Sequence, residues 1–331
     1  MTVLEKYIER GLIPKSVEEL DLGKNKGIFV KIGIVSETTG YLIIRNNDAT
    51  ETTSEEFYGE ERVVIPGSKW RGAERSFALA LLRKVDGIIP KEYSRNAVIR
   101  KDLIISNPLS ILFGDSSIGE GQEMLSIASR IYYDWSYSYE SLGKITERLT
   151  HNSLSDSGAI LTDESGKVQS NALYNIQYIK PGVKFIRFIT LENVSKEFID
   201  LAAMTITGTT RYGARTAILG YNVFNKILGI GFAKGDKPIS SYSIMSQAWQ
   251  KEDYNPEELI IESMKTNYGE NLLKSDELQQ YLNEIKETYQ DNQKLKESME
   301  RIMNKAKSDW SRLLTKDRKR KGASENESSQ T

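Results

Sequence analysis

Basic side chains gather at the point where a strand is expected to turn into a helix. The segment VIPGSKWRGAER, residues 64–75, ends a β-branched run at a Pro-Gly corner and continues at helical spacing. Ser68 is the expected N-cap, which would point unpaired backbone N–H groups the same way as Lys69, Arg71 and Arg75. Cations spaced along these turns would track a phosphodiester chain. The segment alone supports equally the alternative of a solvated basic helix face.

A second segment, TGTTRYGAR at residues 207–215, has the composition of a phosphate-contacting loop. Its glycines allow close backbone approach, and its side chains suit a sugar-phosphate chain. The alternative is a helix-to-strand loop that needs a positive φ at Gly208 and Gly213. A phosphate-loop NTPase is a poor match, because the Gly-Lys-Ser/Thr ending is missing. The candidate RNA contacts in this loop are Thr209, Arg211, Tyr212 and Arg215.

A third candidate region is the stretch 142–173, which has no sustained periodicity and contains the basic residues Lys144, Arg148 and His151. Turn formers at 163–166 predict a projecting β-finger. His151 is the only imidazole in the chain. Because no acid or thiol pattern surrounds it, we interpret it as a solvated loop residue or an RNA contact and not as a general base. This disfavours a His-dependent hydrolase.

Composition limits the remaining function classes. The chain has 331 residues, a hydrophobic fraction of 39% and a net charge of -1, so a nucleic-acid site must be a local stripe and not a general basic coat. With no cysteine and one histidine, we expect no disulfide, no metal site and no cofactor. No apolar run approaches the roughly 20 residues of a membrane span, and the N-terminus does not resemble a signal peptide. We therefore expect a soluble cytoplasmic protein without membrane contact.

The first half of the chain supplies strands around the basic helix. We expect a short helix at 3–8 and a hairpin of strands 27–35 and 41–45. The acidic stretch 46–61 is expected to be a mobile loop, with a metal-carboxylate cluster as the less favoured alternative. Residues 107–122 have the composition of a connection.

The segment 131–139 alternates strictly between aromatic and polar residues. Its aromatic side chains, on one strand face, are expected to be core, with the polar face in water. A stacking platform for unpaired bases is the alternative. The aromatic residues are Tyr133, Trp135, Tyr137 and Tyr139.

The second half begins with the clearest hairpin of the sequence, 174–179 with 183–191. A helix capped by Ser195 follows, and then a strand at 217–233 whose glycines suggest bends or bulges. From Asn255 the chain is expected to be helical. A capping box opens one helix, and Ser275 caps a long one-sided helix that runs to about 314, with apolar residues spaced by three to four positions except near Asn292.

This order of elements predicts an α+β fold: a split β-α-β, ferredoxin-like sheet of the kind that RNA-recognition (RRM) domains use, with long insertions. Residues 1–254 would form this domain, with a finger-like insertion within about 87–130 and a projecting hairpin insertion within about 142–173. Residues 255–315 would be a helical region, and 316–331 a disordered basic and polar tail.

Four segments carry a resemblance to a known family. Residues 64–75 are similar to the strand-Pro-Gly-Ser signature of the RAMP superfamily of CRISPR proteins. The segments ILFGD at 111–115, RYGA at 211–214 and KILGIGFA at 226–233 resemble the backbone subunit of the type I-D CRISPR surveillance (Cascade) complex. The resemblance extends from about residue 27 to residue 249.

The resemblance implies a non-catalytic subunit whose copies polymerise along CRISPR RNA and present the guide for pairing with target DNA, beside other CRISPR complex subunits. Carried over by position, Lys69, Arg71 and Arg75 would lie along the guide backbone, with the loop 207–215 against it. Relatives carry a cysteine cluster just before the Leu-Phe-Gly segment. In this chain residues 104–110 occupy that place, and none of them is a cysteine. A metal-free insertion is expected here.

Two other functions remain open on the same fold. One is a backbone subunit that cleaves target RNA, as in type III complexes, with Asp48 as the candidate acid in the loop before the Pro-Gly-Ser motif. The other is a guide-processing endoribonuclease, which would need a His, Tyr or Lys constellation at the scissile phosphate.

Overall fold

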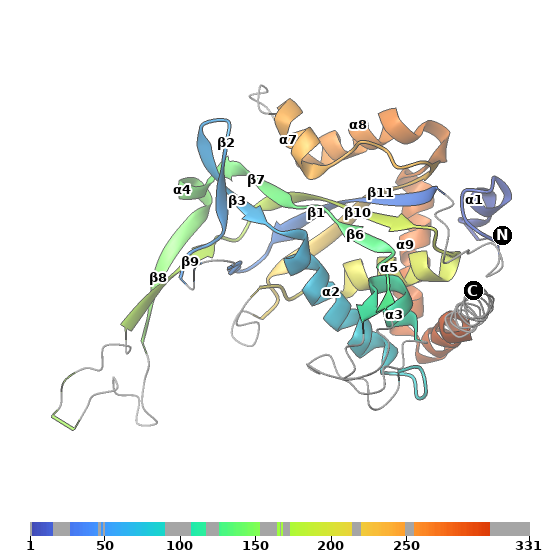
Figure 1. Cartoon of the computed structure of the whole chain (residues 1–331), viewed down its shortest axis with the longest axis horizontal. Helices are drawn as coiled ribbons and strands as arrows, with labels where there is room; N and C mark the ends of the chain where they lie inside the picture. Colours follow the sequence, from blue (N-terminus) through green and yellow to red (C-terminus); the bar gives the residue numbers. More distant parts are fainter. Residues whose placement is uncertain are drawn as a thin grey trace, which may run out of the picture.

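The structure is a computed structural model that describes residues 2–15, 27–45, 48, 50–89, 107–116, 126–152, 164–165, 167, 173–213, 220–248 and 255–304. Within these residues an eight-stranded antiparallel sheet runs in the order β12-β11-β1-β10-β7-β3-β2, and β6 also pairs with β10 (Figure 1). Smaller sheets join β4 (Asp115–Ser116) to β5 (Ser126–Ile127) and β8 to β9. The chain is therefore a mixed α and β protein with an antiparallel sheet.

The centre of the sheet is β1 (Ile28–Thr38), which pairs with β10 (Lys184–Glu192) on one side and β11 (Val223–Lys234) on the other. All three strands are buried over most of their length, because helices cover both faces of the sheet. The outer strands of this core are β6 (Ile131–Tyr133) and β12 (Leu272–Leu273).

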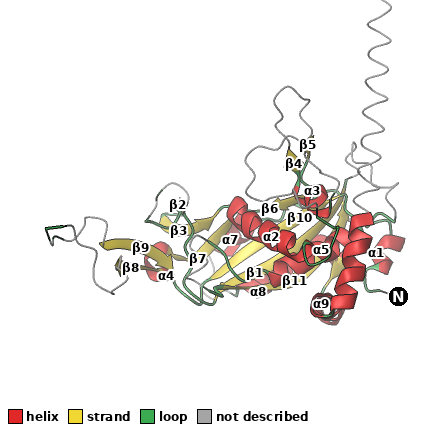
Figure 2. Ribbon diagram, turned by 90° about the horizontal axis from the view of Figure 1, so that it is seen from below, coloured by secondary structure: helices red, strands yellow, loops and turns green. Residues whose placement is uncertain are grey.

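The helices form a layer on each face of the sheet (Figures 1 and 2). One layer contains α2 (Gly67–Leu82), α3 (Pro108–Phe113), α5 (Lys196–Gly208) and α9 (Ser275–Gln290). The other contains α7 (Ser241–Ala248) and α8 (Pro256–Tyr268). The ring of Tyr268 lies so close to Gly231 that a Cβ there would collide with it. This glycine of β11 therefore serves the close approach of α8. The expected bulge lies beside Gly229, where the pairing of β11 with β1 shifts register between Gly33 and Ile34.

The hairpin of β8 (Thr146–Asn152) and β9 (Leu173–Ile179) projects from the main sheet, beginning at α4 (Leu142–Ile145) (Figure 1). The expected pairing of 174–179 with 183–191 is therefore wrong. Between β9 and β10 the chain leaves one sheet for the other: Ile179 bridges to Leu42, and the amide of Gly182 donates to the carbonyl of Thr38. A turn sequence can reorient a chain as well as close a hairpin.

Two N-terminal expectations are also wrong. Residues 41–45 do not pair with β1, whose two edges are taken by β10 and β11. The acidic stretch is not all loop, since β2 (Ser54–Phe57) and β3 (Glu60–Ile65) form a hairpin there. Its two turn residues, Tyr58 and Gly59, have φ values of 52° and 79°, as a type I′ turn requires.

The expectation for 131–139 is half right: the rings of Tyr133, Tyr137 and Tyr139 pack against the core, but the polar face is not in water. The strand is broken into β6 and β7 (Ser136–Ser141), and Ser136 and Ser138 are fully buried whereas Trp135 is 48% exposed. The Ser136 hydroxyl accepts a hydrogen bond from Trp70 Nε1 at 3.0 Å, and the Ser138 hydroxyl accepts one from the Val63 amide at 3.0 Å. Partnered hydroxyls cost little to bury, so the inner face need not be the apolar one.

The expected helices are present where the structure describes them, but Ser195, at the N-cap position of α5, makes no side-chain capping hydrogen bond. A short helix, α1 (Glu5–Glu9), opens the chain, and the Asn255 side chain caps α8 by accepting from the Glu257 amide. α9 breaks at Asp291 before helical residues 292–304. It packs internally on α5, where the Tyr281 hydroxyl donates to Asp200 Oδ1 at 2.8 Å. Residues 107–122 are not only a connection, since they include α3. The 316–331 tail and most of the finger-like insertion lie outside the described residues.

Candidate nucleic-acid interface

The basic helix and the glycine-rich loop form two walls of one pocket, with a volume of about 820 Å³. One wall is the face of α2 that carries Lys69, Gly72 and Ser76, and the other is the loop from Gly208 to Gly213. The fold thus brings together two basic segments that are about 140 positions apart in the sequence.

The pocket carries two cations with no ion-pair or hydrogen-bond partner among the described residues, Lys69 and Arg211. Lys69 is half-buried on the helix and Arg211 is exposed on the loop. Since no described residue neutralises either charge, both side chains are available to an anionic ligand.

The other two predicted helix cations do not line this pocket. Residues two and six positions after Lys69 lie on a different side of a helix with 3.6 residues per turn. The Arg71 guanidinium donates to the Phe113 carbonyl and lies 5.8 Å from the centroid of that ring. The Arg75 guanidinium lies 3.8 Å from Asp115 Oδ2. Of the three expected cations, only Lys69 therefore lines the pocket. Arg71 and Arg75 contact the chain at residues 113 and 115, and an RNA contact by either stays a prediction.

The expected N-cap is also shifted. α2 begins at Gly67, with Pro66 at the N-cap position and no side-chain cap, so Ser68 is the second helical residue. Its exposed side chain lines the pocket.

Tyr212 is not a surface contact, contrary to the expectation. It is 1% exposed, its ring meets Trp70 edge-on at 4.9 Å, and its hydroxyl donates to Glu74 Oε1 at 2.8 Å. The hydroxyl also accepts a hydrogen bond from Asn225 Nδ2 at 2.8 Å. Burial, and after it the charge of Glu74, raises the pKa of Tyr212 well above its usual value. Tyr212 thus anchors the loop from beneath.

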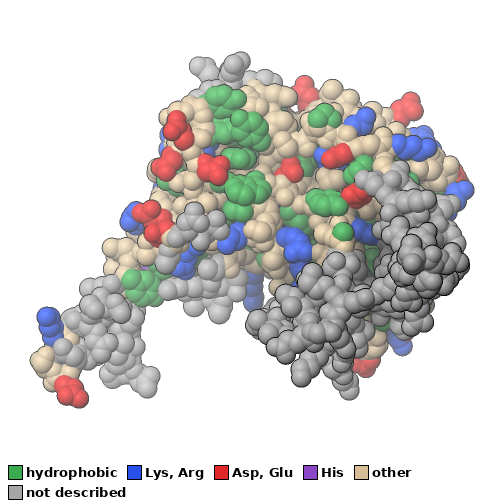
Figure 3. Space-filling model, viewed as in Figure 1, with side chains coloured by type: hydrophobic (Ala, Val, Ile, Leu, Met, Phe, Trp, Pro, Cys, Tyr) green, Lys and Arg blue, Asp and Glu red, His purple; other side chains and the backbone are tan. Residues whose placement is uncertain are grey.

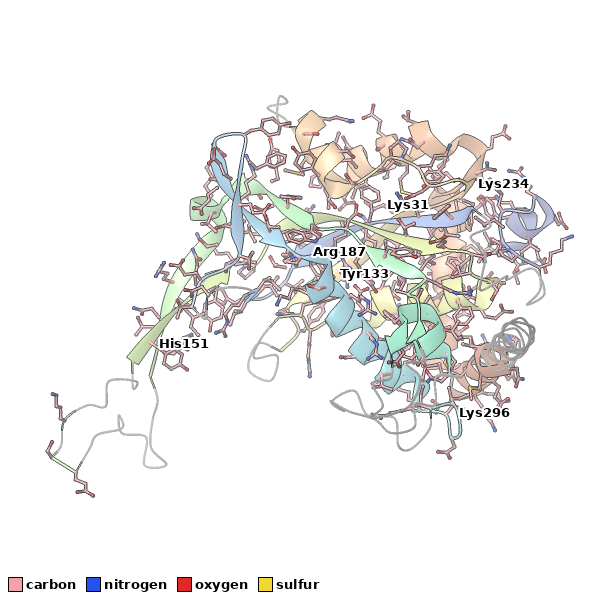
Figure 4. The ribbon with its side chains drawn as sticks, viewed as in Figure 1. Lys31, Tyr133, His151, Arg187, Lys234 and Lys296 are labelled. Carbon is pink, nitrogen blue, oxygen red and sulfur yellow. The ribbon has the colours of Figure 1, made fainter. Side chains whose placement is uncertain are left out.

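Glu74 is the centre of a buried network under the pocket. Its Oε1 accepts from Arg187 at 2.6 Å, with both side chains of the ion pair at most 1% exposed, and its Oε2 accepts from the Tyr133 hydroxyl at 2.8 Å. Figure 4 shows Arg187 and Tyr133 side by side at the junction of the sheet and α2. The network ties the α2 wall to the loop wall through Tyr212. No sequence pattern points to this network, because its members lie on segments that are distant in the sequence.

The backbone of the loop is fixed by two close contacts. Gly213 has a φ of +86°, and a Cβ there would collide with the carbonyl of Ile43. Gly208, the last residue of α5, has no positive φ and is instead packed against the Phe77 ring. The Thr209 hydroxyl donates to the Thr205 carbonyl at 2.7 Å, so it serves the helix end although Thr209 lines the pocket. Arg215 lies outside the described residues.

The three candidates of the third region lie on α4 and β8, apart from the pocket (Figure 4). Lys144 is exposed, and Arg148 forms an ion pair with Glu51. The His151 ring stacks on Tyr174 at 5.4 Å, and its Nε2 lies 2.6 Å from the Tyr178 hydroxyl. His151 is therefore packed within the hairpin and is not the solvated loop residue we expected.

Asp48, the candidate acid for target cleavage, holds its own loop. Its Oδ1 accepts hydrogen bonds from the hydroxyl and the amide of Thr50 and from the Glu51 amide. The two Thr50 bonds, with that of Glu51, lower the pKa of Asp48. Within the described part of the chain, His, Asp and Glu form no group of three that could hold a metal ion.

The surface away from the pocket is acidic around the β2–β3 hairpin. Figure 3 shows acidic side chains over this hairpin beside a group of hydrophobic ones. The hydrophobic group includes Tyr58 and Tyr242, each about half exposed. Repulsion from the acidic rim makes this region unsuited to a phosphodiester chain. No helix of the described residues has both the length and the apolar character needed to cross a membrane.

Comparisons with known proteins point in one direction. A family model described as "Csc2 Crispr" matches residues 12–299. The crystal structure of Thermofilum pendens Csc2 aligns with a TM-score of 0.56 and 17% identity, over 96% of this chain and 97% of that one. A chain of a CRISPR RNA-guided surveillance complex aligns at 13% identity over 80% and 86% of the two chains, with a TM-score of 0.43. A chain of a type IV-B CRISPR complex aligns at 15% identity over 68% of this chain and 100% of that one, with a TM-score of 0.40. A search of curated proteins found no match.

Proposed function

The chain belongs to the Csc2 family of CRISPR proteins, and we propose that it is a non-catalytic backbone subunit of a CRISPR RNA-guided complex. Copies of the chain assemble along the guide RNA and leave it open to pair with target DNA. Its partners are the RNA, further copies of itself and the other subunits of the complex.

The strand order supports an RRM-like palm. The strands β11-β1-β10-β6 are antiparallel neighbours, with α2 between β1 and β6 in sequence and α5 between β10 and β11. This is the arrangement of a split β-α-β domain. The projecting β8–β9 hairpin is the proposed thumb, and it extends to Ile179, beyond the expected boundary at 173. Because α7 and α8 cover one sheet face and α2 and α5 the other, RNA binds at the α2 edge and not on the sheet.

The observation that carries the proposal is the pocket between α2 and the loop. Its free cations come from two different elements, and its walls include backbone and small side chains with no group arranged to read a base edge. Contacts of this kind hold a sugar-phosphate chain in register and carry no sequence information. A subunit that accepts any guide needs such contacts. The type I-D subtype is the finer part of the proposal and rests on the segments at 111–115, 211–214 and 226–233.

Charge removal in the pocket tests the RNA site. The double variant Lys69→Gln/Arg211→Gln is expected to weaken binding of unrelated RNAs alike. The slope of log affinity against log salt should fall by about 1.4, since each single-strand phosphate contact contributes about 0.7. Fluorescence anisotropy over a salt series measures both quantities. The control, Lys234→Gln/Lys265→Gln, removes two exposed cations outside the pocket and should leave the slope unchanged. Equal slopes for the two double variants would refute the site.

Nuclease assays test the non-catalytic part. The purified chain is incubated with labelled guide RNA and labelled complementary RNA. Both strands should remain intact while the guide is bound. Cuts in the complementary RNA would instead support target cleavage, and cuts in the guide would support a processing endoribonuclease. If the Asp48→Asn variant no longer cut the complementary RNA, Asp48 would be a catalytic residue.

A further inference from the structure

One end of the pocket between α2 and the loop is aromatic. Tyr289, near the end of α9, lines the pocket together with Phe77 of α2. Their ring centroids lie 6.0 Å apart, with an angle of 31° between the planes. Both residues are half-buried and line the cavity that also receives Lys69 and Arg211. The helical C-terminal region therefore contributes a side chain to the proposed RNA site.

Tyr289 differs from the tyrosine that packs α9 into the core. Tyr281 is buried, and its hydroxyl donates to Asp200. The Tyr289 hydroxyl has no hydrogen-bond partner among the described residues, and the Lys84 ammonium lies 4.8 Å from its ring centroid. Tyr289 is therefore not held in the core as Tyr281 is, and its ring stands at the pocket wall, where a ligand can reach it.

Building on the proposed RNA-binding function, we propose that Phe77 and Tyr289 form a stacking site for one nucleobase of the bound RNA. Lys69 and Arg211 hold neighbouring phosphates in the same pocket. The volume of about 820 Å³ lies within the range of roughly 300–1,000 Å³ that is usual for pockets that bind small molecules. Every base presents a π-face, so an aromatic contact adds affinity without selecting a sequence. The C-terminal helix thereby becomes part of RNA recognition.

The test compares RNA with a backbone that has no bases. Tyr289→Leu removes the ring and keeps an apolar side chain beside Phe77, whereas Tyr289→Phe keeps the ring and removes the hydroxyl. The control Tyr242→Leu replaces a half-exposed tyrosine on α7, outside the pocket. Each full-length variant is checked by thermal melting and titrated with a polyuridine RNA and with an abasic ribose-phosphate oligomer of equal length.

Tyr289→Leu should bind the polyuridine about fivefold more weakly or worse, the lower end of the usual effect of losing one stacked base. It should bind the abasic oligomer as the wild type does. Tyr289→Phe and Tyr242→Leu should match the wild type on both ligands. An equal loss on both ligands, or no loss on either, overturns the stacking site.

A second measurement does not depend on how the variants fold. RNA containing 5-iodouridine, irradiated on the wild-type chain, should crosslink to Tyr289 or Phe77, as mapped by mass spectrometry of the peptides. Crosslinks elsewhere only would refute the stacking site while leaving RNA binding in place. If the wild type binds no RNA at all, the proposed function fails, and that result is distinct from the failure of the aromatic contact alone.

Discussion

The two hydroxyls that reach Glu74 permit a sharp separation of stability from RNA binding. Tyr212→Phe and Tyr133→Phe each delete one hydrogen bond to the same buried carboxylate, one at Oε1 and the other at Oε2, both 2.8 Å long. Only Tyr212 belongs to the loop that presents Arg211. If Glu74 positions that loop, the two variants must differ in RNA affinity.

The stability effects follow from the partners that remain. After Tyr212→Phe, Oε1 still accepts from Arg187 at 2.6 Å, and Asn225 Nδ2 still donates to the carbonyls of Ile206 and Thr209. After Tyr133→Phe, Oε2 loses its only hydrogen bond from the described residues. A hydrogen bond to a charged group contributes about 1.5–3 kcal/mol, and a stranded acceptor costs more. Tyr133→Phe should therefore lower the free energy of unfolding at least as much as Tyr212→Phe.

RNA affinity should rank the other way. Freeing the loop displaces Arg211, so Tyr212→Phe should lower the salt slope of RNA binding by up to about 0.7, one single-strand phosphate contact. Tyr133→Phe should leave that slope at the wild-type value. Urea unfolding and salt-dependent anisotropy measure the two properties on the same samples. If both variants weakened RNA binding in proportion to their loss of stability, Glu74 would be a core residue without a positioning role.

Three further predictions concern the loop, the sheet and the hairpin. An alanine at a positive φ costs roughly 1 kcal/mol. Gly213→Ala should destabilise the chain by more than this, because its Cβ would also collide with the carbonyl of Ile43. Gly220→Ala, at a φ of +64° with no atom close to the new Cβ, should cost only the roughly 1 kcal/mol, and thermal melts compare the two variants. Burial raises the pKa of Asp134 to about 6, so the folded state binds the proton more tightly than the unfolded state. The free energy of unfolding of the wild type should therefore fall as the pH rises from about 4 to about 6. Relative to Asp134→Asn the fall should reach about 2 kcal/mol in urea unfolding, and a pH-independent difference would contradict this. Replacing 153–172 with a Gly-Ser linker should keep the melting temperature and disturb the regular spacing of copies on RNA, and unchanged loading would remove the thumb role.

The last prediction refines what the sequence implied. The sequence placed a projecting hairpin insertion within about 142–173. The structure shows that Ile145 is buried and that β8 pairs along all of β9, whose Ile176 and Tyr178 are themselves core residues. Only the part beyond the paired strands can be replaced without exposing apolar surface.

Local patterns predicted the elements that local interactions determine. The Pro-Gly corner before α2 and the capping of α8 by Asn255 depend on neighbours within a few positions, and both are present in the structure. The apolar runs likewise predicted β1 and β11 as strands. The two glycine-containing segments that the sequence singled out line one pocket, and their contact with RNA stays a prediction.

The sequence could not tell which face of each element meets which partner. Periodicity places Lys69 and Arg71 on different sides of α2, but only the packed helix α3 shows that Arg71 is occupied and Lys69 is not. Tyr212 had the residue type of an RNA contact, and its role was decided by Glu74, 138 positions away. Strand pairing, the burial of the serine face of β7 and the arrival of Tyr289 at the pocket are likewise non-local. The sequence pointed to the segments that line the pocket, and the tertiary structure determined which of their side chains have no partner among the described residues, because burial and partnership are properties of contacts between distant segments.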